Sequence, residues 1–338
     1  MRQVVTTATG GPEVLQVREI ADRAPSGAEV RIRVKACGIN FADIMARQGL
    51  YPDAPKLPAA MGYEVSGVVD AAGPDAREGW VDQEVFALTR FNGYADTVVV
   101  PENQVFHKPA SLSHAQCAAI PVNYLTAWQL MVVVGSLSAD ETVLIHNAGG
   151  GVGLAAIDIG RHIGARMIGT ASQGKHPFLK ERGLHEAIDY RSGDWLREVK
   201  RLTDDKGVEL VLDPFGGRHL KQSYKALRPT GRLGMFGISS TTESRLPGPL
   251  KLLGMAAGLP LFHPVPLMNT NRAVFGANLG HLWHEVDKIR LWCDILVEGV
   301  EAGWVRPHVD AEFPLDKAGE AQAYVEARRN TGKVVLKP

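Results

Sequence analysis

The chain has 338 residues, 45% of them hydrophobic, with 37 Lys and Arg, 37 Asp and Glu, and three cysteines. This length predicts about two domains of a globular protein. Zero net charge gives no bulk attraction to nucleic acid, and three cysteines exclude both a disulfide framework and a four-cysteine zinc site. The first residues contain no long apolar run, so we expect a cytoplasmic protein with no stable membrane insertion.

The first 120 residues are predicted to be rich in β-strands. Residues 29–36 alternate apolar and charged side chains, which is typical of a half-buried strand. Further short strands are predicted over residues 3–7, 15–19, 65–69, 84–88 and 94–100. Short strands separated by Gly and Pro favour a barrel or sandwich over a parallel sheet.

From Thr142 onward, short apolar runs alternate with helical patterns. Strands are predicted over residues 142–145, 166–170, 187–190, 208–212 and 232–236. Between them, helices are predicted to begin near Val152 and His176, and a third helix is predicted to be capped by Ser192 and ended by Gly207. This alternation predicts a doubly wound parallel sheet.

The last part of the chain begins with an apolar, proline-rich segment over residues 246–268. Its prolines and charges argue against a spanning helix. It is predicted either to bury itself as a structured insert, to cover a substrate cleft, to form a dimer interface or to contact a membrane surface. A strand at 273–275, helices at 281–300 and 316–329, and a closing strand at 333–336 follow.

The strongest chemical motif is the glycine cluster that follows the strand at 142–145. Its small residues fit a Rossmann fingerprint with alanine in the first place, and a helix follows directly. Such residues let backbone N–H groups approach a pyrophosphate, and the helix N-terminus favours the negative charge. We therefore predict that the cofactor contacts Ala148, Gly150, Gly151, Val152 and Gly153.

The residues after the second strand of this sheet select the nicotinamide cofactor. NAD enzymes place Asp or Glu there for the ribose hydroxyl, whereas this chain has Ser172 and Lys175 and no acid. A hydroxyl and an ammonium suit a 2′-phosphate, so we predict NADPH. The alternative is that Lys175 is a solvated lysine at a helix start.

The whole chain resembles the medium-chain dehydrogenase/reductase superfamily. The resemblance is carried by the glycine cluster and by the segments Ala36–Asp43 and Gly62–Val69. In the zinc alcohol dehydrogenases, the positions of Asn40 and Tyr63 hold a cysteine and a histidine ligand. An amide and a phenol are poor zinc ligands, so no metal site is predicted. The chain therefore resembles the zinc-free quinone oxidoreductase branch, which includes zeta-crystallin, and residues 271–279 most resemble its vesicle-amine-transport-protein-like subgroup.

This resemblance implies an α/β fold made of a GroES-like β-barrel catalytic domain and a Rossmann domain with a doubly wound parallel sheet. The catalytic domain is expected over residues 1–121 and the NADP-binding domain over 122–268. Residues 269–338 are expected to return to the catalytic domain, after a last Rossmann strand near 273–276. The superfamily also implies a homodimer, with residues 273–275 as its edge strand.

The resemblance also implies the site residues. Catalytic roles are expected for Asn40, Tyr51, Tyr63 and Thr126. Besides the glycine loop, Ser172 and Lys175, cofactor contacts are expected for Asn40, Thr126, Tyr190, Phe236, Gly237, Phe275 and Lys333. Three structural alternatives stay open: Asn40 as a helix cap, Tyr63 as a core tyrosine bonded to backbone, and Lys333 as a surface lysine. His146, before the glycine loop, is predicted to be structural.

The predicted function is a zinc-independent, NADPH-dependent reduction of quinones or α,β-unsaturated carbonyls by hydride transfer. A ketone would lack its Lewis acid here, whereas hydride addition to a quinone or an activated C=C leaves charge that hydrogen-bond donors can stabilise. The alternatives are an enoyl-thioester reductase and a non-catalytic NADPH-binding or membrane-associated protein.

Overall fold

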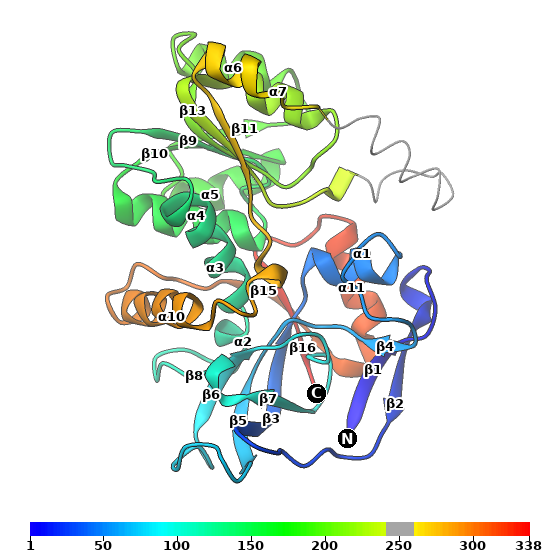
Figure 1. Ribbon diagram of the computed structural model, residues 1–338. Helices are drawn as coiled ribbons and strands as arrows, with labels where there is room; N and C mark the ends of the chain where they lie inside the picture. The colour runs from blue at the N-terminus through cyan, green and yellow to red at the C-terminus, as the bar shows by residue number, and fades with distance from the viewer. Residues whose placement is uncertain (241–259) are drawn as a thin grey trace. The chain divides into compact units, whose positions relative to one another are not determined.

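The computed structural model describes residues 1–240 and 260–338, which form two compact units (Figure 1). The first unit contains residues 1–125, 279–303 and 307–338. The second contains residues 126–278 and 304–306. The two junctions therefore lie four and ten residues beyond the predicted boundaries at 121 and 268.

The first unit is built on two β-sheets. A three-stranded sheet has the order β2 (Leu15–Glu19), β1 (Arg2–Thr6) and β4 (Ala59–Ala60). The larger sheet has the order β15 (Val309–Pro314), β16 (Lys333–Lys337), β3 (Glu29–Gly38), β5 (Glu64–Ala72), β6 (Glu84–Leu88) and β8 (Val105–His107), with β7 (Thr97–Pro101) also paired to β3. The predicted alternation in β3 is confirmed, because Val30, Ile32 and Val34 are all buried.

Short helices accompany these strands. The first unit contains α1 (Phe41–Arg47), α2 (His114–Cys117), α10 (Val286–Glu301) and α11 (Ala318–Glu326), and α3 (Pro121–Trp128) contains the junction to the second unit. The helix predicted from residue 281 begins five positions later, because residues 279–281 form a 3₁₀ turn.

The second unit is a six-stranded parallel sheet. Its order is β11 (Glu186–Asp189), β10 (Arg166–Ala171), β9 (Thr142–Ile145), β12 (Val208–Asp213), β13 (Leu227–Met235) and β14 (Ala273–Gly276). The helices α4 (Gly151–Ile163) and α5 (His176–Arg182) contact each other on one face, and α6 (Trp195–Leu202) and α7 (His219–Lys225) contact each other on the opposite face (Figure 1). The predicted doubly wound sheet is confirmed, and its strand order reverses between β9 and β12, where such sheets bind ligands.

The prediction for the ends of α6 is wrong. Its N-cap is Asp194, whose carboxylate accepts hydrogen bonds from the N–H groups of Leu196 and Arg197 at 3.0 and 3.3 Å. Ser192 lies outside the helix and its hydroxyl donates to the Asp189 carbonyl. The helix ends at Leu202 instead of Gly207, because the two residues after Thr203 adopt left-handed backbone conformations.

The apolar segment predicted over residues 246–268 lies partly outside the described residues. Leu261, in its described part, is 92% exposed, and Met268, in α9 (Pro264–Thr270), is 66% exposed. These two side chains are therefore not buried in a self-contained insert. Within residues 1–240 and 260–338, no helix has both the length and the apolar character needed to cross a membrane.

Candidate active site

The glycine loop joins β9 to α4 at the carboxyl edge of the second unit's sheet. Asn147 turns the chain with a left-handed φ of 52°, and the Ala148 N–H donates to the Thr170 carbonyl at 3.0 Å. Gly150 is the N-cap of α4, and no side chain caps this helix. The N–H groups of its first turn, at Gly151–Gly153, are therefore available to an anionic ligand.

Close backbone packing requires glycine at position 153 of this loop. A Cβ atom on Gly153 would lie 2.6 Å from the Ala148 carbonyl oxygen. Such a contact cannot be relieved by a side-chain rotation, because the backbone fixes the positions of both the Cβ atom and the carbonyl oxygen. The loop therefore has the cradle that a pyrophosphate needs.

Lys175 lies beside the same loop, although it follows a different strand. The chain leaves β10 at Ser172 and forms a short 3₁₀ turn over residues 173–175. A Cβ atom on Gly149 would lie 2.8 Å from Lys175 Cδ and 3.8 Å from its Nζ. The turn thus brings an ammonium next to the glycine loop, while the predicted role of Lys175 toward a 2′-phosphate stays a prediction.

Other predicted cofactor residues follow neighbouring strands. Ala171 of β10 pairs with Asp189 of β11, so Ser172 and Tyr190 lie at the same edge of the sheet. The guanidinium of Arg191 lies 5.5 Å from the centre of the Tyr190 ring. Half-buried Phe236 and Gly237 follow β13, half-buried Phe275 lies in β14, and buried Thr126 lies on α3, all in the second unit.

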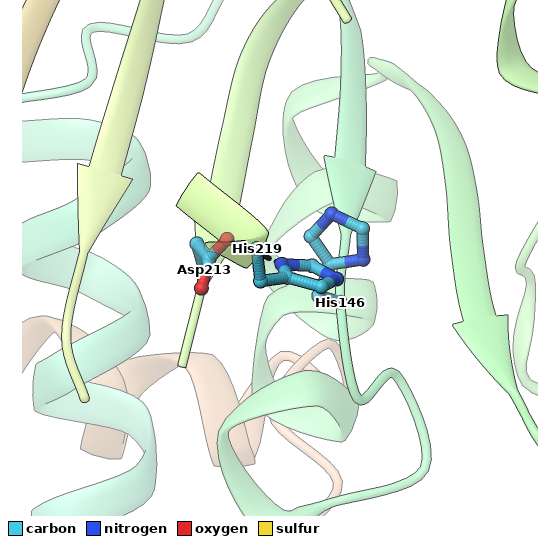
Figure 2. Close-up of side chains that lie close together, drawn as sticks. All are labelled: His146, Asp213 and His219. Carbon is cyan, nitrogen blue, oxygen red and sulfur yellow. Dashed lines mark hydrogen bonds and ion pairs between the residues drawn. The ribbon is translucent and has the colours of Figure 1, made fainter. Parts of the chain in front are cut away.

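A buried polar cluster that we did not predict adjoins the start of the glycine loop (Figure 2). His146 follows β9, Asp213 ends β12, and His219 begins α7. The Asp213 carboxylate lies 2.7 Å from His219 Nδ1 and accepts a hydrogen bond from the Ser223 hydroxyl at 2.6 Å. The His146 ring nitrogens lie 3.0 Å from Thr170 Oγ1 and 3.2 Å from Ser223 Oγ.

Burial and hydrogen bonding set the charges of His146 and Asp213. It lowers the pKa of His146 to about 3, so that this imidazole is neutral at neutral pH. Burial alone would raise the pKa of Asp213, but the hydrogen bonds from His219 and Ser223, together with the two nearby imidazoles, lower the value to about 2. One ligand atom from each of the three residues lies within 4.8 Å of the others. Since these atoms already have hydrogen-bond partners, we interpret the cluster as fixing the ends of β9 and β12.

In the first unit, the structure brings Asn40 together with Glu64 and Lys333. Asn40 Nδ2 donates to Glu64 Oε1 at 2.9 Å, and Lys333 Nζ donates to Asn40 Oδ1 at 2.6 Å. Lys333 also forms an ion pair with Glu64, whose other oxygen accepts from the Val122 N–H at 2.8 Å. Asn40 also occupies the N-cap position of α1, in a capping box with Asp43, whose carboxylate accepts a hydrogen bond from the Asn40 N–H at 2.8 Å.

The alternative that Lys333 is a surface lysine is wrong. Its side chain is 2% exposed, and that of Glu64 is fully buried. A buried ammonium requires a compensating charge and hydrogen bonds, and Glu64 and Asn40 provide them. The pairing of Glu64 with Lys333 was not predictable from local patterns, because β5 and β16 are far apart along the chain. A glutamate at the start of the apolar strand β5 was a local signal of a buried charge in this region.

The side chain of Tyr63 packs against two other aromatic rings. The side chain is largely buried, and its ring centre lies 6.3 Å from that of Tyr51 and 5.1 Å from that of Phe91. Across the described residues its hydroxyl has no hydrogen-bond partner, so the alternative of a tyrosine bonded to backbone is wrong. Tyr51 and Tyr63 line a cavity of about 440 Å³ within the first unit. Burial, followed by the charge of Asp43, raises the Tyr63 pKa, so the phenol is a neutral donor.

Comparison with known proteins agrees with this arrangement. Residues 26–110 match the family model of the alcohol dehydrogenase GroES-like domain, and residues 182–336 match that of zinc-binding dehydrogenase. The chain is 36% identical to the human synaptic vesicle membrane protein VAT-1 homolog, over 100% of this chain and 86% of the relative. It is 30% identical to human quinone oxidoreductase, over 99% and 97% of the two chains.

Solved structures of related proteins also resemble this chain over its full length. Escherichia coli quinone oxidoreductase complexed with NADPH superposes with a TM-score of 0.87 at 27% identity, covering both chains fully. The human VAT-1 homolog-like protein has a TM-score of 0.87 at 30% identity, covering 100% of this chain and 98% of the other. The CurK enoyl reductase has a TM-score of 0.85 at 25% identity, covering 99% and 98%.

A GroES-like unit and a doubly wound sheet with a nucleotide loop define an oxidoreductase that uses a nicotinamide cofactor. The chain belongs to the medium-chain dehydrogenase/reductase superfamily, in the branch of the quinone oxidoreductases and VAT-1 homologues.

The residues present do not fit the zinc ion that some members of this superfamily hold. The side chain of Asn40 is bonded to the Lys333 ammonium, which repels a metal cation. Neither this amide nor the Tyr63 phenol is a good zinc ligand. We derive no catalytic step through a metal at this position.

Proposed function

We propose that the protein is an NADPH-dependent, zinc-independent reductase of quinones or α,β-unsaturated carbonyl compounds. The observation that carries the proposal is the ammonium of Lys333 beside Asn40, where a zinc-dependent relative would place its metal. Without a Lewis acid, reduction of a simple ketone is disfavoured. Quinones and conjugated carbonyls accept hydride more readily, because the negative charge is delocalised onto an oxygen that donors can stabilise.

The glycine loop fits the nicotinamide dinucleotide. The uncapped N-terminus of α4 binds the pyrophosphate, and the ammonium of Lys175 binds the 2′-phosphate. Arg191, at the end of the neighbouring strand β11, adds a second positive charge at this edge. When bound, the cofactor supplies a hydride.

The residues of the first unit bind and polarise the acceptor. The acceptor's β carbon, or a quinone carbonyl, gains the hydride, and the displaced electron pair moves to an oxygen. The neutral Tyr63 hydroxyl donates a hydrogen bond to that oxygen. A proton from solvent completes the reduction, so that one NADPH is oxidised to NADP⁺ for each acceptor reduced. Asn40 is a positioning residue, since Glu64 and Lys333 hold its amide.

The test is oxidation of NADPH by the purified protein with a quinone, an enone, an enoyl thioester and a simple ketone, each with and without a chelator. We expect turnover of the quinone and the enone that does not change with chelator. Turnover restricted to the enoyl thioester would replace the proposal by the enoyl-thioester reductase. Tight NADPH binding without any turnover would support a non-catalytic protein.

The cofactor preference is tested at Lys175. We expect Lys175→Ala to lower the ratio of kcat/KM for NADPH over NADH by about 10- to 100-fold, as the loss of a charge-assisted hydrogen bond implies. The matched control is Lys180→Ala, which removes an exposed lysine from α5. An unchanged ratio in Lys175→Ala would show that this lysine does not recognise the 2′-phosphate.

A further inference from the structure

The cavity in the first unit has a lining that the predicted function does not explain. It combines four aromatic rings with four charged or ionisable side chains, and its volume is about 440 Å³. This is large enough for a small organic ligand. The lining residues are Tyr51, Asp53, Tyr63, Arg90, Phe91, Gly280, His281, Trp283 and His284.

The aromatic rings favour a flat ligand. Tyr63 meets Tyr51 edge-on at an interplanar angle of 77° and Phe91 at 51°, so neither ring stacks on Tyr63. Trp283, which precedes α10, contributes a further large ring to the lining. Rings in such orientations offer both faces and edges to a planar conjugated molecule.

The Tyr63 hydroxyl gives this ligand a polar anchor. The side chain is 7% exposed and its oxygen has no hydrogen-bond partner across the described residues. Buried hydroxyl groups normally have a partner. A carbonyl oxygen of a ligand in the cavity would supply the missing acceptor.

Arg90 gives the cavity a second polar anchor, which is a charged guanidinium instead of a neutral hydroxyl. Asp53 lies 2.6 Å from His281 Nε2, and His284 lies 3.8 Å from Glu285, so these groups have partners of complementary character. Arg90 is exposed and has no ion pair or hydrogen bond to any residue in 1–240 or 260–338. A guanidinium binds a carboxylate through two parallel hydrogen bonds.

We propose that the preferred acceptor is a planar conjugated carbonyl compound that carries a carboxylate. Its ring packs against the aromatic lining, its carbonyl oxygen accepts from Tyr63, and its carboxylate binds Arg90. This inference rests on the proposed reductase function and adds no step to it. Arg90 thereby becomes the residue that determines specificity, and Tyr63 the residue that contacts the reacting oxygen.

The experiment compares two probes that differ in charge and little in shape: the para-carboxylate of 4-phenylbut-3-en-2-one and its para-carboxamide. We expect the carboxylate to have a kcat/KM about 10-fold or more above that of the carboxamide, since a charge-assisted hydrogen bond is the difference between them. Arg90→Gln is expected to reduce this ratio to about 1, and Arg90→Lys to leave an intermediate ratio. The control is Arg18→Gln, which removes an exposed arginine of β2 and should keep the ratio of the parent protein.

Two readouts separate this inference from the proposed function. Kinetics report turnover, and quenching of tryptophan fluorescence, with Trp283 in the cavity lining, reports binding of each probe without turnover. Equal rates and equal affinities for the two probes would overturn the carboxylate specificity and leave the reductase function intact. Preferential binding of the carboxylate, lost in Arg90→Gln, with no NADPH oxidation by any acceptor, would support the specificity and overturn the reductase function.

Discussion

The glycine loop of the second unit and the Asn40 cluster of the first unit are sites built in opposite ways. The loop presents backbone N–H groups, and its residues lie within one strand–turn–helix segment. The Asn40 cluster presents side chains, which come from the start of α1, from β5 and from β16. A site made of backbone groups requires small side chains, so that a ligand can approach the N–H groups. A site made of side chains requires that residues distant in the sequence come into contact. Each therefore fails under a different kind of substitution.

The largest effect is expected at the glycine loop. Gly153→Val places a side chain against the Ala148 carbonyl, 2.6 Å from the position of the new Cβ. The loop must then move away from the helix start, and we expect NADPH affinity to fall by about 100-fold or more, since several backbone hydrogen bonds are lost together. NADPH fluorescence on titration measures this.

The control for Gly153→Val is Gly193→Val in the same unit. A Cβ on Gly193 would have no atom within 4 Å, so this variant should bind NADPH as the parent does. If Gly153→Val also retained parental affinity, the backbone cradle would not be the cofactor site.

The next effect concerns the side-chain site and its stability. Lys333→Met leaves the fully buried Glu64 without its cation. We expect the free energy of unfolding to fall by about 3–5 kcal/mol, as for other buried pairs that lose one partner. The double variant Lys333→Met/Glu64→Gln should recover part of this loss, because no uncompensated charge remains. Unfolding in urea, followed by fluorescence, measures these values.

Lys337→Met is the matched control on the same strand. Its side chain is 57% exposed and its ammonium pairs with Glu312 at the surface, so we expect a loss of less than about 1 kcal/mol. A loss in Lys333→Met no greater than in this control would mean that the buried pair does not stabilise the first unit.

The smallest effect is expected at the N-cap of α6, which we predicted at Ser192 and which the structure places at Asp194. Asp194→Ala removes the cap of α6 and should lower the free energy of unfolding by about 1 kcal/mol. Ser192→Ala, two residues earlier, should change it by less than about 0.5 kcal/mol. If urea unfolding showed equal effects of the two substitutions, Asp194 would not be the residue that caps α6.

Much of the fold was predictable because periodicity is a local property. The strands β6 and β9 begin and end at the predicted residues, and the helix α5 begins at the predicted His176. The caps of α6 were not predictable from composition alone, because Ser192 and Asp194 are both good caps and the choice depends on where the chain leaves β11. Of the candidate site, Asn40, Tyr51 and Tyr63 came from resemblance, whereas Glu64, Arg90, Asp213 and Trp283 received no predicted role.

The sequence by itself determined the parallel sheet, the β-rich unit and the nucleotide loop, since each depends on the order of neighbouring residues. It also determined that Asn40 and Tyr63 are poor zinc ligands, which is a matter of residue chemistry. Only the tertiary structure decided that Lys333 is buried against Glu64 and Asn40, and that Arg90 and Tyr63 line one cavity. The reason is physical: burial and charge pairing depend on contacts between strands that are remote in the chain, and no local pattern records them.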